Sequence, residues 1–138
     1  HPPAGVAVTS MVFDKKTHPA VSYYDAHPAD LKYARHTGVE WQRQVLATRG
    51  AVGLYTRIWM DRNDRPTILY YNRTRNLLLE SRQSTTGVWS TQTIHQTGGR
   101  YIAATVRAPA ANDHDPDVLF SWYDSIDRKL VLQSRFAT

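Results

Sequence analysis

Cysteine is absent from the 138 residues, which excludes disulfides and thiol chemistry but does not identify a compartment. No apolar run approaches the ~20 residues that a membrane helix needs, so we expect no membrane span. No stretch of ten or more residues shows a helical period, so we predict no helix. A Gly-x-Ser-x-Gly elbow, a phosphate-binding loop and a His-x-x-x-His pair are also missing. These absences favour a non-catalytic protein without a cofactor.

The chain is basic, but its charge is dispersed. Lys and Arg number 17 against 12 Asp and Glu, which gives a net charge of +5. No run of five or more basic residues occurs, as a nucleic-acid-binding tail would have. A solvated basic surface is therefore favoured over nucleic-acid binding.

An aromatic-aromatic-Asx triplet recurs roughly every 47 residues, and such internal repetition indicates repeated structural units. The triplets are Tyr23-Tyr24-Asp25, Tyr70-Tyr71-Asn72 and Trp122-Tyr123-Asp124. Trp41 and Trp89 each follow a turn that contains glycine. We expect Tyr23, Tyr70, Trp122 and both of these tryptophans to pack between or within the units.

Each unit contains short runs rich in Val, Ile, Tyr, Trp and Thr, bounded by Gly, Pro, Asn and Asp, and such runs predict β-strands. The predicted strands are Val8–Phe13, Ala20–Asp25, Leu31–His36, Trp41–Ala47, Tyr55–Met60, Thr67–Asn72, Leu77–Gln83, Val88–His95, Tyr101–Arg107, Val118–Asp124 and Lys129–Arg135.

Stranded repeats of this length predict an all-β fold with the blades of a β-propeller. We expect blade 1 at about 7–48, blade 2 at about 54–96 and an incomplete blade 3 at about 100–138, all in one propeller segment. Three blades cannot close a ring, so two apolar faces would stay exposed. A second copy or another propeller-forming chain is therefore the expected partner, giving a ring of six to seven blades.

The repeat resembles the blades of exported bacterial β-propellers of the sialidase-like or lectin-like kind. The residues that carry the resemblance are Pro19 to Asp25, Asp30 to Ala34 and Gly38 to Trp41, with a second Gly-x-Trp turn at Gly87 to Trp89. The aspartate of the Asp-box turn is not at its expected place. The resemblance implies a secreted or extracellular protein, and its implication for function is weaker because propellers host many activities.

If the first strand of each unit is innermost, one end of the propeller gathers two sets of loops. We expect this end to bind a ligand, with glycan as the candidate, because carboxylate, amide and guanidinium groups bind sugar hydroxyls and aromatic faces pack on sugar rings. The candidate ligand-binding residues are Asp25, Tyr55, Arg57, Asn72, Arg73, Arg100, Tyr101 and Asp124.

Alternatives remain for several of these residues. Asp25, Asn72 and Asp124 recur in every unit, which favours turn capping over ligand contact. Arg57 breaks the repeat, and so does Trp59, which makes both better functional candidates. The alternating acids of residues 112–117 resemble the start of a calcium loop but lack its Gly and Glu, so a solvated turn is favoured and no metal is expected.

The sequence thus predicts a non-catalytic, lectin-like binding module. Two alternatives stay open: a scaffold that completes a propeller with a partner and carries no ligand, and a fragment of a glycan-processing enzyme.

Overall fold

The structure is a computed structural model that describes residues 6–111 and 113–136. These residues form eleven antiparallel strands and no helix. The strands are β1 (Val6–Phe13), β2 (Pro19–Asp25), β3 (Asp30–His36), β4 (Trp41–Ala47), β5 (Val52–Met60), β6 (Pro66–Asn72), β7 (Leu77–Gln83), β8 (Trp89–His95), β9 (Arg100–Arg107), β10 (Asp117–Asp124) and β11 (Lys129–Arg135). All eleven predicted strands are therefore confirmed. The largest difference is at β5, which begins at Val52 instead of Tyr55 because the chain pairs irregularly there.

Each repeat unit forms one sheet in which consecutive strands pair, in the orders β1-β2-β3-β4, β5-β6-β7-β8 and β9-β10-β11. Asx turns connect the first two strands of the first two sheets. The Asp14 carboxylate accepts hydrogen bonds from the backbone N–H groups of Lys16 and His18, and the Asp61 carboxylate does the same for Asn63 and Arg65. These side chains fix tight antiparallel turns at equivalent places in the two units.

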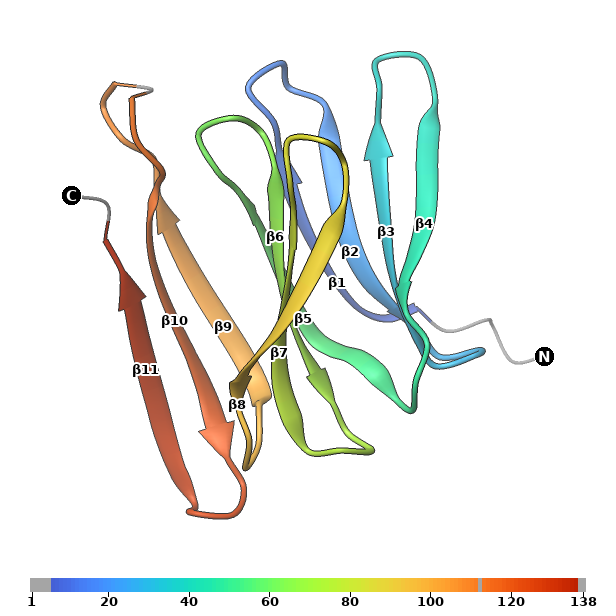
Figure 1. The fold of residues 1–138 in the computed structure, drawn as a ribbon, viewed down its shortest axis with the longest axis vertical. Coiled ribbons are helices and arrows are strands. Elements are labelled where there is room, and N and C mark those ends of the chain that lie inside the picture. Colours follow the sequence, from blue (N-terminus) through green and yellow to red (C-terminus); the bar gives the residue numbers. More distant parts are fainter. Residues whose placement is uncertain (1–5, 112, 137–138) are drawn as a thin grey trace.

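The three sheets lie side by side in chain order (Figure 1), with β5 in contact with β1, β2 and β3, and β9 in contact with β5 and β6. One buried cluster lies between the first and second sheets, around Leu31, Tyr33, Ile58, Met60 and Tyr70. The second lies between the second and third sheets, around Trp59, Leu78, Ile102, Phe120 and Trp122. The middle sheet is thus covered on both faces, and every residue of β6 is buried.

Two polar contacts, one buried and one partly buried, join the first sheet to the second. Thr56 Oγ1 and Ser22 Oγ lie 2.8 Å apart, and both residues are fully buried. The backbone N–H of Ile58 donates to Ser10 Oγ over 3.1 Å. Because buried hydroxyls must be hydrogen-bonded, these pairs set the lateral position of one sheet on the other.

The tryptophans show where the packing predictions succeed and fail. Trp122 is buried in the second cluster, and Trp89 packs on Tyr33 of the preceding sheet at a ring distance of 5.2 Å. Trp41 was expected in the core, but this prediction is wrong, because its side chain is exposed. It pairs with His36 on the face of the first sheet that points away from the second, where no sheet of the described chain covers it. Trp59, which was singled out for function, lies in the second cluster and stacks on Phe120.

Candidate functional site

Two sets of connections lie at one end of the three sheets, the lower end in Figure 1: the β2–β3, β6–β7 and β10–β11 loops, and the β4–β5 and β8–β9 links. Backbone hydrogen bonds join the two sets. Arg73 N donates to Ala51 O over 2.8 Å, and Val52 N donates to Ala29 O over 3.2 Å. We call this the loop end, and all the candidate ligand-binding residues but Arg57 lie on its loops or at the strand positions beside them.

The three recurring Asx residues hold their own loops. Asp25 accepts from the backbone N–H of His27 over 3.1 Å and from Lys32 Nζ over 2.6 Å, and the Lys32 hydrogen bond lowers the pKa of the carboxyl. Asn72 is buried, and its side-chain oxygen accepts from the backbone N–H of Arg75. Its amide donates to Arg49 O. The polar atoms of Asn72 are therefore directed into the loop region and not toward solvent.

Asp124 is the most enclosed of the three. Its Oδ1 accepts from the backbone N–H groups of Ile126 and Asp127, and its Oδ2 lies 2.6 Å from both Thr97 Oγ1 and His95 Nε2. The Thr97 hydrogen bond is the largest cause that holds the pKa of this carboxyl well below its usual range, ahead of the opposing effect of burial. The Thr97 hydroxyl and the Asp124 carboxylate both contact Nε2 of His95. In a catalytic triad the hydroxyl and the carboxylate contact different nitrogens of the imidazole, so this cluster is not arranged as a triad.

Tyr55 and Tyr101 occupy equivalent repeat positions and share an unusual backbone conformation. Both have φ of 54°, in the left-handed region that non-glycine residues seldom adopt, and both lie where the strand pairing is irregular. Their ring centroids are 5.1 Å apart, and the row of rings continues to Tyr71 at 6.0 Å and Tyr123 at 6.5 Å. A β-bulge re-aims a side chain, and here two bulges place neighbouring phenol rings together across two sheets.

The candidate arginines are placed differently from one another. The pKa of Arg100 is raised, chiefly by its interaction with the Tyr71 hydroxyl, so its guanidinium lies near the tyrosine row. Arg73 is exposed on the β6–β7 loop. Arg57 is half-buried, and its Nη1 donates to Thr56 O over 2.8 Å. The structure therefore groups Tyr55, Tyr101 and Arg100 and leaves Arg57 outside that group.

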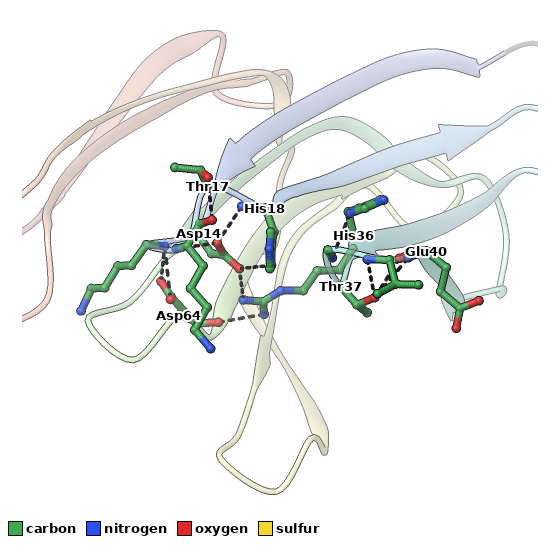
Figure 2. Close-up of polar contacts among 12 residues, drawn as sticks. Asp14, Thr17, His18, His36, Thr37, Glu40 and Asp64 are labelled. Atoms are coloured by element: carbon green, nitrogen blue, oxygen red, sulfur yellow. Dashed lines mark hydrogen bonds and ion pairs between the residues drawn. The ribbon is translucent and has the colours of Figure 1, made fainter.

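The opposite end carries a polar network that sequence analysis did not predict. Figure 2 shows Asp14 and Asp64, which belong to the first-to-second strand turns of the first and second sheets. The Asp64 carboxylate accepts from Lys15 N. The Arg35 guanidinium donates to Asp14 Oδ2 over 3.0 Å and to Asp64 O over 2.9 Å. One arginine thus ties two sheets together.

Beside this network, a cavity of about 620 Å³ opens between the second and third sheets. Sequence analysis missed it because its basic residues are far apart in the chain. One residue in the sequence could have indicated the cavity. Glu80 is a buried acid, whereas the equivalent residues of the other two units are Tyr33 and Leu132.

Residues 112–117 do not provide a metal site that can be described. Asn112 lies outside the described residues, and among the described residues no group of three or more His, Asp or Glu side chains is placed to hold a metal ion. No helix within residues 6–111 and 113–136 is long and apolar enough to cross a membrane.

Comparisons with known proteins do not assign the chain to a family. No protein-family model matches the chain, and no curated protein matches it. Function must therefore be argued from the geometry alone.

Proposed function

We propose that the chain is a section of a β-propeller whose two end faces are covered by further sheets of the same kind, and that it acts as a non-catalytic binding module. The observation that carries this proposal is a comparison of equivalent leucines. Leu31 and Leu78 are 0% exposed, because each is covered by the next sheet, whereas Leu130 is 65% exposed. The sequence thus has leucine at this position in all three units, although in the third unit no sheet of the described chain packs over it.

The opposite end face shows the same pattern. Met11 and Phe13 of β1 are 63% and 64% exposed. Their counterparts on β5 are Ile58 and Met60, which pack against the first sheet and are 6% and 8% exposed. Exposed Leu119 and Leu132 lie on the third sheet together with Leu130. Contiguous apolar faces on a soluble protein mark surfaces that associate.

A radial arrangement is supported by the first strands. β1 contacts β5, β5 contacts β9, and segments of all three line one cavity of about 500 Å³, at Met11–Phe13, Ile58–Met60 and Ala104–Val106. Innermost strands that line a shared central space are typical of a propeller, which usually has ~4–8 blades. The covering sheets would come from a second copy or from another polypeptide segment with the same repeat.

Sedimentation velocity of the purified chain over a hundredfold concentration range tests the proposal. We expect a species of at least twice 15.7 kDa, with a mass that depends on concentration. A monomer at every concentration, with the same fold and no binding of an apolar dye to its end faces, would contradict it.

Glycan is the candidate ligand class, and a specific observation favours it. Tyr55 and Tyr101 present neighbouring rings near the guanidinium of Arg100, a combination suited to packing on a sugar ring and binding its hydroxyls. A glycan array probed with the assembled protein tests this. Arg100→Gln should reduce the signal on any bound glycan, while Arg107→Gln, an exposed control at the other end, should leave it unchanged. Equal loss in both variants, or no glycan bound at all, would favour the ligand-free scaffold.

A further inference from the structure

The cavity of about 620 Å³ between the second and third sheets lies at the end opposite the loop end and is strongly basic. Four arginines line it: Arg62 and Arg65 from the β5–β6 turn, Arg82 from β7, and Arg135 from β11. Its volume is within the range of ~300–1,000 Å³ typical of small-molecule sites.

At the equivalent place between the first and second sheets an arginine bridges the two sheets, and the comparison shows what differs at the cavity. Arg35 on β3 pairs opposite Ala20, and Arg82 on β7 pairs opposite Thr67, so the two arginines hold equivalent positions. Arg35 bridges the sheets through Asp14 and Asp64 (Figure 2). An arginine at the second position would be expected to do the same.

Arg82 does not form this bridge. Asp61, the counterpart of Asp14, is occupied by Arg65 of its own turn, whose Nε lies 2.7 Å from Asp61 Oδ2. The turn of the third sheet that would supply the backbone acceptor is replaced by the longer segment 108–116. Within the described chain, Arg82 pairs with Glu80 alone, at 3.2 Å, and its side chain is 55% exposed.

Glu80 does not neutralise the cavity, because it is shared. Its buried carboxylate forms an ion pair with Arg135 as well as with Arg82. Arg135 also lies over the Phe120 ring at 5.2 Å, which fixes its direction. The four arginines therefore face three carboxylates, those of Asp61, Asp115 and Glu80, and one positive charge remains unbalanced. Hydrogen bonds from guanidinium groups to an oxyanion are charge-assisted and strong, so an anion would be bound favourably here.

We propose that this cavity binds a small organic anion that carries a carboxylate or phosphate group. The Arg82 guanidinium is the main contact for the anionic group, since planar guanidinium groups bind such oxyanions with paired donors. Ser84 and Ser90 add hydroxyl donors at the wall, and Trp59 and Phe136 supply an apolar wall for the rest of the molecule. Both sheets belong to one chain, so the site does not depend on how the end faces are covered.

The test is a titration of ¹⁵N-labelled protein with inorganic phosphate, acetate and benzoate at constant ionic strength, with benzyl alcohol as the uncharged comparison. We expect amide shifts confined to the turns and strands around the cavity, with benzoate binding tighter than acetate because it also uses the apolar wall. Arg82→Gln should weaken benzoate binding by about 10- to 100-fold, the loss expected for charge-assisted hydrogen bonds.

Arg75→Gln is the matched control, because it removes the same charge from an exposed loop of the same sheet at the far end. It should leave benzoate affinity unchanged. The proposal is overturned if Arg82→Gln binds as the parent does while keeping its fold by circular dichroism. It is also overturned if both variants lose affinity equally, which would indicate a general charge effect, or if benzyl alcohol binds as well as benzoate.

Discussion

Leu130 offers the sharpest test of the idea that the end faces are covered. A Leu→Ala change at a fully buried position costs about 2–5 kcal/mol, so Leu78→Ala should destabilise the fold by this amount. In the isolated chain Leu130 has lost only about a third of its exposure, and Leu130→Ala should then cost about 1 kcal/mol or less. Once a further sheet covers the residue, the cost should approach that of Leu78→Ala.

The difference between these two costs must therefore appear in association. A loss of about 2 kcal/mol at the interface weakens the assembly about 30-fold. Sedimentation equilibrium measures this shift, and urea unfolding at two protein concentrations measures the stabilities. Leu78→Ala should lower the unfolding midpoint at both concentrations, whereas Leu130→Ala should lower it mainly at the higher one. If Leu130→Ala leaves the association constant unchanged, the third sheet's outer face is not an interface and the reasoning fails.

Three further predictions concern the fold. The pKa of Asp124 is lowered chiefly by its Thr97 hydrogen bond, so the ionised carboxylate stabilises the folded state at pH values above the ordinary pKa of an aspartate. This stabilisation is lost as the pH falls toward the lowered pKa. Asp124→Asn should therefore reduce the loss of stability at acid pH in a stability-versus-pH curve. Gly53→Ala should destabilise more than Gly87→Ala in thermal melts, since both have positive φ but only at Gly53 would the new Cβ meet backbone at 2.8 Å. Thr56→Val should cost about 1–3 kcal/mol by urea unfolding, because it leaves a buried serine hydroxyl unpaired.

The strands could be predicted from sequence because their signals are local. Apolar runs bounded by turn residues recur in each unit, and the first turns of the first two units are closed by hydrogen bonds from nearby backbone N–H groups to Asp14 and Asp61. Even at β5, where the prediction was poorest, the error was confined to one strand end. Tyr55 lies at a bulge with positive φ. Glycine or asparagine usually adopts this conformation, so a tyrosine gives no sign of it in the sequence.

Features that depend on the neighbouring sheet could not be predicted in this way. Trp41 and Trp89 have the same local sequence context, yet one is exposed and the other packs on Tyr33. The difference is whether the described chain supplies a preceding sheet to cover the tryptophan. Likewise, Arg35 and Arg82 hold the same repeat position, and only the spatial neighbours decide which one bridges two sheets.

These paired comparisons also give the strongest argument about function. In a repeat protein, equivalent positions of stacked units are expected to carry similar residues, so a chemical departure at one of them needs a local cause. Glu80 stands where the other units have an apolar or aromatic residue, and a buried carboxylate is costly unless cations compensate it. Arg135 and Arg82 provide that compensation and together bring more positive charge into the cavity than the acids there balance. An apolar side chain would suit packing better at this buried position, and the charged cluster found instead supports the proposal that the cavity binds an anion.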